Sequence, residues 1–355
     1  LFADALYKKS GGIRGVFLFM KGKYFDEPRA RTACQKKIIG KGVSYTMANV
    51  FITGASGMIG LALTEMLLRK KHRVFAVDER NNDLIGTDQN YTFVQCDITD
   101  KESIKSIIES NQIDTIAHLA CTVDNDLDPL VTDAEMKRSK LCDKFLYETA
   151  DKCGVKNIVL TSTSNVYGLQ KGREPIRETT AEKGSSNYVD MKLTSEKLLM
   201  KAMKKSDTVP VIARVAPIYT AEFTDNLREH VYDKKEDVAY IYKEGEYGFS
   251  FCCMYNYIDF ISGVIEIPSG RYEGVYNVCD TRPITAKEIL DFEREHHRIG
   301  AVIQRNPPSG VSFNKSKGKT DYRFFDPGAA FGNWNIDNTR AKRISTFRWT
   351  LSNTK

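Results

Sequence analysis

The chain has 355 residues, 41% of them hydrophobic and 28% charged, which is enough for a large α/β domain with a sizeable buried core. It has no apolar run of about 18 or more residues, so no membrane-spanning helix is predicted. The net charge is +6, but residues 1–46 hold ten lysines and arginines against three acidic residues. The remainder is close to neutral, which gives no electrostatic support for nucleic-acid binding.

Three regions are expected along the chain. The sequence does not open on methionine, and Met47 stands directly before the first convincing strand. We interpret residues 1–46 as a basic leader outside the fold. Residues 47–216 are predicted to form a dinucleotide-binding domain. Residues 217–355 are predicted to form mainly a substrate-binding cap, with some segments returning to the first domain.

Short apolar runs alternate with stretches of helical periodicity between residues 50 and 215. Strands are expected at residues 50–53, 74–77, 92–95, 115–119, 157–161 and 209–215, and helices at 59–70, around 104–108, at 134–153 and from 188 onward. Strands that alternate with helices predict a doubly wound parallel sheet, the Rossmann-type α/β fold. The shorter elements after residue 217 suit a smaller C-terminal α/β cap on the substrate side.

The eight cysteines form no C-x-x-C pair and have no histidine companions at zinc spacing. Several lie in apolar contexts, where a free thiol packs as a small hydrophobic group. We therefore predict no metal site and a reducing, cytoplasmic location.

A glycine turn follows the first expected strand and opens the first expected helix. Its backbone can approach phosphate oxygens while the helix N-terminus faces the anion. We expect the pyrophosphate of a dinucleotide to bind there, at Gly54, Gly57, Met58, Ile59 and Gly60. The spacing G-x-x-G-x-x-G also suits a plain strand–helix turn, so this motif alone does not establish a dinucleotide site.

Asp78 ends the second expected strand, 18 residues beyond Gly60. A carboxylate at that place can accept hydrogen bonds from the adenosine ribose. It also repels a 2′-phosphate, which favours NAD over NADP. Arg80 is the counter-indication, because a basic residue could bind that phosphate.

Asp97 and Ile98 follow the third expected strand and are candidates for contacts with the adenine. The same segment reads equally well as the start of a helix, since Thr99 and Asp100 are residues that cap helix N-termini. The sequence leaves both interpretations open.

The pattern Tyr-x-x-x-Lys occurs twice, at Tyr167/Lys171 and at Tyr188/Lys192. The first pair lies in a glycine-containing loop, where a spacing of four residues defines no common face. The second pair begins a helical stretch, so both side chains project from one face. Lys192 could then stabilise the phenolate of Tyr188 and hold the nicotinamide ribose, and the phenolate could accept a proton from a substrate hydroxyl.

Taken together, these motifs resemble the extended short-chain dehydrogenases/reductases, in the branch of NAD-dependent epimerases and dehydratases that modify sugar nucleotides. The matching segments are residues 53–60, 118–120, 161–168, 188–192 with Glu196, 214–217, 257–259 and 274–278. The resemblance covers most of residues 49–280 and is specific as a set.

The resemblance implies further residue roles. Thr163, four residues before the tyrosine of the Val-Tyr-Gly string, matches the catalytic hydroxyl beside Tyr188 and Lys192. Leu119 and Ala120 would line the cofactor cleft. The cofactor would be NAD, the substrate a nucleotide-sugar or another small molecule, and the assembly a homodimer formed through the helices that end near Cys153 and begin near Tyr188.

The family's reactions share a first oxidation of a sugar carbon to a ketone and differ afterwards. Dehydratases carry Asp-Glu after the threonine and decarboxylating relatives carry Glu before Val-Tyr-Gly, whereas this chain has Ser164 and Asn165. This difference favours an epimerase. The alternatives are an NAD(P)-dependent reductase or dehydrogenase of a non-nucleotide substrate and a non-catalytic cofactor sensor. Arg271, Arg282 and Arg343 are candidates for a substrate pyrophosphate.

Overall fold

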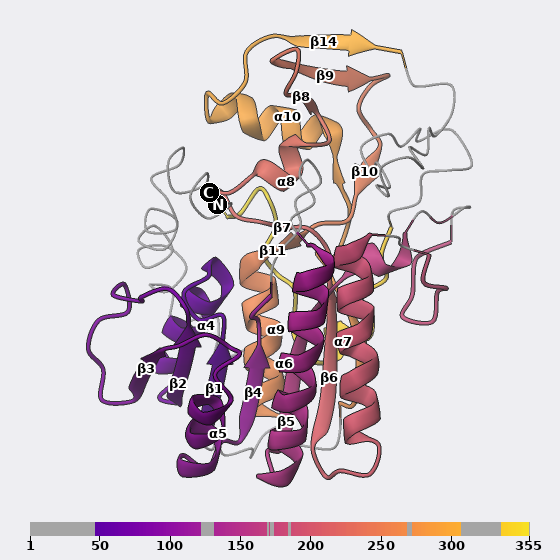
Figure 1. Ribbon diagram of the computed structural model, residues 1–355. Helices are drawn as coiled ribbons and strands as arrows, with labels where there is room; N and C mark the ends of the chain where they lie inside the picture. Colours follow the sequence, from indigo (N-terminus) through magenta and orange to yellow (C-terminus); the bar gives the residue numbers. More distant parts are fainter. Residues whose placement is uncertain are drawn as a thin grey trace.

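The computed structural model describes residues 47–121, 131–168, 170, 174–183, 186–267, 272–306 and 335–354, and the expected leader, residues 1–46, lies outside them. A seven-stranded sheet forms the centre (Figure 1), in the order β12-β6-β5-β4-β1-β2-β3 and parallel throughout. The strands are β1 (Asn49–Thr53), β2 (Arg73–Asp78), β3 (Tyr91–Gln95), β4 (Thr115–His118), β5 (Asn157–Thr163), β6 (Val209–Val215) and β12 (Gly274–Val278). The six strands expected before residue 217 all belong to it, so the predicted doubly wound sheet is confirmed.

Helices cover both faces because alternate strand residues point to opposite sides of the sheet. Val50 and Ile52 of β1 share a hydrophobic core with the buried residues of α4 and α9. Phe51, between them, belongs to a second core with buried residues of α5, α6 and α7. In Figure 1, α6 and α7 stand side by side in front of the sheet. These helices are α4 (Met58–Arg69), α5 (Lys101–Ser110), α6 (Asp133–Lys152), α7 (Asn187–Met203) and α9 (Met254–Glu266).

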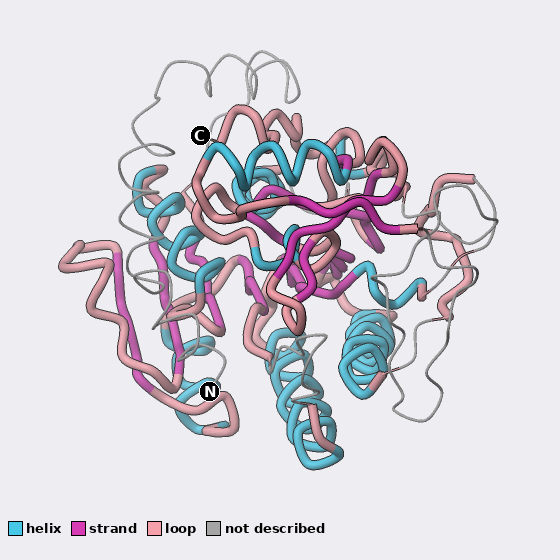
Figure 2. The backbone as a smooth tube through the Cα atoms, turned by 90° about the horizontal axis from the view of Figure 1, so that it is seen from above, coloured by secondary structure: helices cyan, strands magenta, loops and turns pink. Residues whose placement is uncertain are grey.

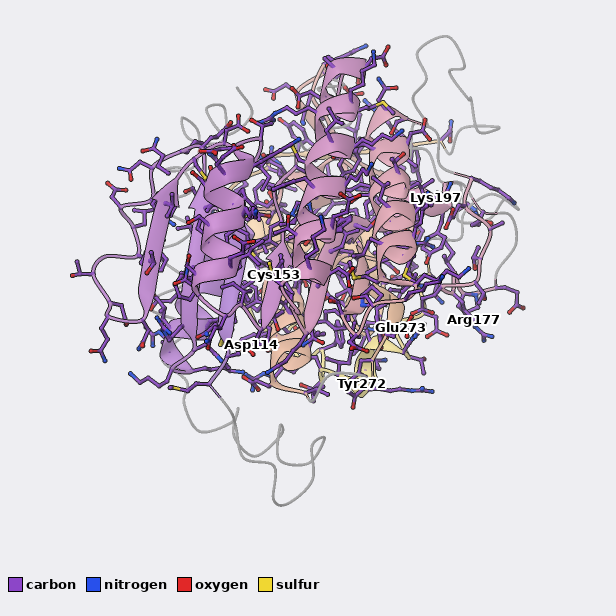
Figure 3. The ribbon with its side chains drawn as sticks, turned by 60° about the horizontal axis from the view of Figure 1, so that its bottom comes forward. Asp114, Cys153, Arg177, Lys197, Tyr272 and Glu273 are labelled. Atoms are coloured by element: carbon purple, nitrogen blue, oxygen red, sulfur yellow. The ribbon has the colours of Figure 1, made fainter. Side chains whose placement is uncertain are left out.

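The sheet reverses its direction of growth at β1. The chain winds outward through β2 to β3, then returns to place β4 on the other side of β1. Open α/β sheets bind ligands outside the carboxyl ends of the strands at such a reversal. At the opposite end, brought forward in Figure 3, Asp114 ties the amino ends together: its carboxylate accepts hydrogen bonds from the Asn49 backbone N–H (2.8 Å) and the Lys156 ammonium (2.7 Å).

A smaller cap lies above the carboxyl ends of the strands, and the view from above shows it crossing the end of the sheet (Figures 1 and 2). Its elements are β7 (Ile218–Tyr219), α8 (Asp225–Arg228), β8 (Tyr232–Asp233), β9 (Val238–Tyr242), β10 (Gly248–Phe249), β11 (Cys252–Cys253), β13 (Ile284–Thr285), α10 (Ala286–Glu295) and β14 (Val302–Arg305). Two segments after residue 217 return to the large domain: β12 joins its sheet and α9 packs against α4. The boundary near residue 217 stays a prediction.

Two further observations concern the described part of the chain. None of its helices is long and apolar enough to cross a membrane. Within the same residues, no three histidine, cysteine or acidic side chains are grouped so that they could hold a metal ion.

Asp280 is a buried carboxylate where the sheet meets the cap. It accepts hydrogen bonds from the Tyr219 hydroxyl (2.6 Å), the Cys253 backbone N–H (2.8 Å) and the Asn256 side-chain amide (2.7 Å). These contacts join the end of β12 to β7 and to the start of α9. Burial raises the pKa of Asp280 to about 6 even though the three donors oppose the rise.

This raised pKa predicts a pH-dependent stability. An unfolded aspartate has a pKa of about 3.9, so the folded state favours the protonated form, and the stability gained from protonation is lost as the pH rises from about 4 through about 6. Asp280 should lower the free energy of unfolding by up to about 3 kcal/mol over this range. Asp280→Asn keeps an acceptor for Cys253 and can donate to Tyr219, so the variant should lack this fall.

Urea unfolding at a pH of about 4.5 and of about 7.5 would measure the difference between wild type and variant. Asp83→Asn, which neutralises an exposed carboxyl, is the control. A wild-type-to-D280N difference that is the same at both pH values would contradict the prediction.

Candidate functional site

The glycine turn brings two backbone segments into direct contact at the reversal of the sheet. Gly54 has a φ of +73°, and a Cβ there would lie 2.8 Å from the backbone nitrogen of Ala120. A Cβ on Gly60 would lie 2.4 Å from the carbonyl oxygen of Gly54. Neither position can take a side chain without displacing backbone, so these two glycines are a steric requirement of the turn.

The N-terminus of α4 is the place where the sequence predicts a pyrophosphate. Gly57 is the N-cap and makes no side-chain cap hydrogen bond, and the first turn holds no acidic residue. The backbone N–H groups at the start of α4, which include those of Met58 and Ile59, therefore meet no competing carboxylate from this turn. This arrangement fits a dinucleotide phosphate.

The Asp78 carboxylate stands beside this turn at the end of β2. One oxygen accepts the backbone N–H of Ser56 at 3.0 Å, and the other accepts the backbone N–H of Arg80, also at 3.0 Å. The Arg80 side chain folds back onto Asp78, with Nε 3.4 Å from the carboxylate. The oxygen that accepts from Ser56 has a second lone pair, so Asp78 can still accept from a ribose hydroxyl.

Asp97 is engaged with α6. Its carboxylate accepts hydrogen bonds from the Thr99 backbone N–H at 2.8 Å and from the Arg138 guanidinium at 2.7 and 2.8 Å. The Thr99 contact, with help from Arg138, holds the pKa of Asp97 below its usual value. The cap of α5 is Asp100, which accepts the backbone N–H of Ser103. Ile98 is half-buried against the core beneath α5 to α7. Contact of Asp97 and Ile98 with adenine stays a prediction.

The backbone of Leu119 and Ala120 packs directly against Gly54, and hydrogen bonds fix its position. The Thr53 hydroxyl accepts both of their N–H groups at 3.2 Å and lies 2.8 Å from Nδ1 of His118. Nε2 of His118 lies 3.0 Å from the carboxylate of Asp143 in α6. The sequence motifs gave no role to Thr53 or Asp143, although a histidine that ends an apolar strand was a usable signal.

Thr163, Tyr188 and Lys192 lie around the carboxyl end of β5. The Thr163 hydroxyl accepts the N–H of Asn165 at 3.2 Å and starts the short 3₁₀ helix η1 (Ser164–Tyr167), which leaves its proton for another acceptor. The buried Lys192 ammonium donates to the carbonyl oxygen of Thr161 at 2.8 Å and lies 5.8 Å from the centre of the Tyr188 ring.

The ammonium of Lys192 stays charged in this setting. Burial lowers the pKa of Lys192, but the Cys121 and Tyr188 side chains beside it outweigh this effect, so the pKa lies above its usual value. Tyr257 of α9 completes the surroundings, with its hydroxyl 2.6 Å from the Thr161 hydroxyl. The sequence singled out the Tyr257 segment by resemblance but gave it no role.

Tyr167, the other tyrosine of a Tyr-x-x-x-Lys match, has the environment of a structural side chain. It is fully buried and donates to the Asn277 side chain at 2.5 Å. Burial raises the pKa of Tyr167 to about 12, which suits a neutral phenol rather than a proton acceptor. Lys171, its partner in the motif, lies outside the described residues.

Of the three arginines predicted to bind a substrate pyrophosphate, the two that the structure describes, Arg282 and Arg343, share no contact in the described residues. Arg271 lies outside the described residues, and Arg343 is exposed on η3 (Ala341–Arg343). Arg282 is exposed and pairs with Glu288 of α10.

Two other arginines meet at one carboxylate in the cap, an arrangement that the sequence did not reveal. Arg228 and Arg298 both face the fully buried carboxylate of Glu293, at 3.5 and 3.3 Å. Arg298 also donates to the carbonyl oxygen of Ala221 at 2.6 Å. Two guanidinium groups therefore share one carboxylate just beyond β7.

The sheet, the glycine turn and the Thr–Tyr–Lys arrangement are those of an extended short-chain dehydrogenase/reductase. Residues 50–279 match the model of the NAD dependent epimerase/dehydratase family, and the chain belongs to this family. The resemblance seen in the sequence is therefore confirmed.

Known proteins agree with this assignment. UDP-glucose 4-epimerase of Bacillus subtilis is 27% identical over 162 residues, which cover 42% of this chain and 46% of that protein. The crystal structure of UDP-glucose 4-epimerase with UDP-glucose from Thermotoga maritima has a TM-score of 0.64 at 19% identity, over 86% of this chain and 95% of that one. UDP-glucuronic acid 4-epimerase from Bacillus cereus in complex with NAD also has a TM-score of 0.64, at 17% identity, over 86% and 95%. The chain spans about half the length of the curated relatives it matches.

Proposed function

We propose that this protein is an NAD-dependent sugar-nucleotide epimerase that oxidises one sugar carbon to a ketone and then reduces it on the other face. The observation that carries the proposal is the position of the Lys192 ammonium. It donates to the carbonyl oxygen of Thr161, two residues before Thr163 in β5, and lies near the ring of Tyr188. The relatives named UDP-glucose 4-epimerase support the same substrate class.

The protein's own part in the reaction is orientation and proton transfer. The Thr163 hydroxyl orients the reacting sugar oxygen, and the Tyr188 phenolate accepts the proton from it. Lys192 stabilises that phenolate, and an N–H not used by Thr161 is available for a ribose hydroxyl. When bound, the nicotinamide supplies the oxidation and the matching reduction. Returning the proton from Tyr188 completes the cycle without another acid.

The neighbours of Thr163 favour epimerisation over elimination. Ser164 is fully buried and Asn165 is partly buried, and neither side chain ionises usefully near neutral pH. Loss of water from the sugar needs a further acid and base, which this stretch does not supply. In the cap, Arg228 and Arg298 support an anionic substrate such as a nucleotide diphosphate.

The central test uses a panel of UDP-, GDP- and dTDP-sugars. The wild type should invert one sugar stereocentre without net release of reduced cofactor, as followed by NMR of the sugar. Tyr188→Phe removes the proton acceptor and should lower turnover by at least about 100-fold while NAD stays bound.

Tyr167→Phe is the matched control for that experiment, because it changes the other motif tyrosine. It loses the hydrogen bond to Asn277, at a cost of about 1 kcal/mol of stability, and should keep its turnover. If Y188F turns over as fast as wild type, or if Y167F is the variant that loses turnover, the proposed roles are wrong.

The cofactor proposal rests on Asp78. A 2′-phosphate would lie against this carboxylate, and Arg80 already contacts Asp78. NAD should therefore bind at least about tenfold more tightly than NADP by fluorescence titration. Asp78→Asn removes the repulsion between the carboxylate and the 2′-phosphate, so the difference in affinity between NAD and NADP should become smaller. Tighter binding of NADP by the wild type would point instead to an NADP-dependent reductase.

We also propose a homodimer formed through α6 and α7. Leu141 of α6 and Met200 of α7 are two of the four large hydrophobic side chains that are exposed within the described residues. The two helices lie side by side, so a two-fold axis beside them would cover both side chains. Leu141→Glu combined with Met200→Glu should shift the mass in analytical ultracentrifugation from dimer to monomer. Ile303→Glu, which changes an exposed residue of the cap, is the control, and a monomeric wild type would refute the proposal.

The cytoplasmic location stays a prediction. The seven cysteines in the described part of the chain are free thiols, which supports it, and Cys34 lies outside that part.

A further inference from the structure

A buried ion pair lies one helical turn beyond Lys192. Glu196 of α7 accepts hydrogen bonds from Arg214 of β6, with Nε 3.1 Å from Oε1 and Nη2 2.7 Å from Oε2. Side-chain exposure is 6% for Glu196 and 4% for Arg214. Glu196 also accepts the hydroxyl hydrogen of Ser162, the residue before Thr163.

These contacts join two successive turns of α7 to two successive residues of β5. Lys192 binds the carbonyl oxygen of Thr161, and Glu196 binds the side chain of Ser162. Ser162 and Arg214 are register partners in neighbouring strands, so Arg214 supports the same point from the next strand. The residue that follows in β5 is Thr163.

Arg214 also holds the segment that leads into α7. Its guanidinium pairs with Glu182, which lies five residues before the helix begins at Asn187. The same guanidinium lies 5.1 Å from the centre of the Tyr167 ring at the end of η1. One cation therefore contacts the helix that carries Tyr188, the chain that precedes it, and the turn that follows Thr163.

We infer that Glu196 and Arg214 are positioning residues, which fix the rotation of α7 so that Tyr188 and Lys192 face Thr163; this rests on the proposed function. Their charges are not needed for burial alone, because well-packed apolar residues often replace a buried ion pair with no loss of stability. Apolar residues would not reproduce the directional bonds to Ser162 and Glu182. Loss of the pair then loosens the geometry of the site while the fold remains.

The test replaces both partners at once, as Glu196→Leu with Arg214→Met, because a single substitution would leave a buried charge unpaired. The control is Lys70→Met with Glu266→Leu, which removes the ion pair between α4 and α9. Glu266 is similarly buried, at 2% side-chain exposure, but this pair contacts Ser262 and His72, which lie outside the proposed site.

The first measurement is the ultraviolet titration of the Tyr188 phenolate, taken as the difference between each protein and its Y188F counterpart. In E196L/R214M the titration midpoint should rise by about one pH unit, because the displaced ammonium of Lys192 stabilises the phenolate less. In K70M/E266L it should stay in place. This measurement needs no sugar substrate.

The second measurement is kcat for the active sugar nucleotide, divided by the fraction of protein that binds NAD. We expect a loss of about 10- to 100-fold in E196L/R214M, with the dissociation constant for NAD within about threefold of wild type. An unmoved titration, or a loss of activity fully explained by protein that no longer binds NAD, would overturn the inference. If the titration moves but the wild type epimerises no sugar nucleotide, the proposed function fails and the positioning role stands.

Discussion

The hydroxyl of Thr53 holds together the two strands between which the sheet reverses. It lies 2.8 Å from Nδ1 of His118 and accepts hydrogen bonds from the N–H groups of Leu119 and Ala120. These contacts fix the distance between the carboxyl ends of β1 and β4. The glycine turn depends on this separation, because Gly54 leaves no space for a side chain against Ala120. A valine at position 53 would have the right shape for the strand but could make none of these bonds.

Polar contacts from α6 and α7 also reach the carboxyl ends of β4 and β5. Asp143 of α6 reaches His118, and Glu196 of α7 reaches Ser162. Elsewhere the same helices meet the sheet through apolar side chains, which tolerate small shifts. Hydrogen bonds in a dry interior tolerate far less, since an unmet donor or acceptor is costly there. These hydrogen bonds therefore restrict small shifts at the carboxyl ends of β4 and β5.

Elements with a local signal were predictable from the sequence. The strands of the sheet and the helix that begins near Tyr188 are predicted from periodicity, and the structure places them accordingly. The choice of Tyr188 over Tyr167 as the catalytic tyrosine stays a prediction. β5 runs two residues further than expected because Thr163 is extended before it caps η1. The Glu196–Arg214 pair, the position of β12 beside β6, and the role of Asp143 depend on contacts between distant residues, for which one sequence carries no signal.

The packing that places Thr163 also limits the chemistry beside it. Ser164 is fully buried, and its hydroxyl has no hydrogen-bond partner among the described residues. A carboxylate at that position would lose its hydration without gaining a donor, which costs several kcal/mol or forces it to stay protonated. Tyr167, three residues on, lies against the Arg214 guanidinium and donates to Asn277. The environment at Ser164 thus disfavours an ionised acid or base, which agrees with the proposal that Tyr188 transfers the proton.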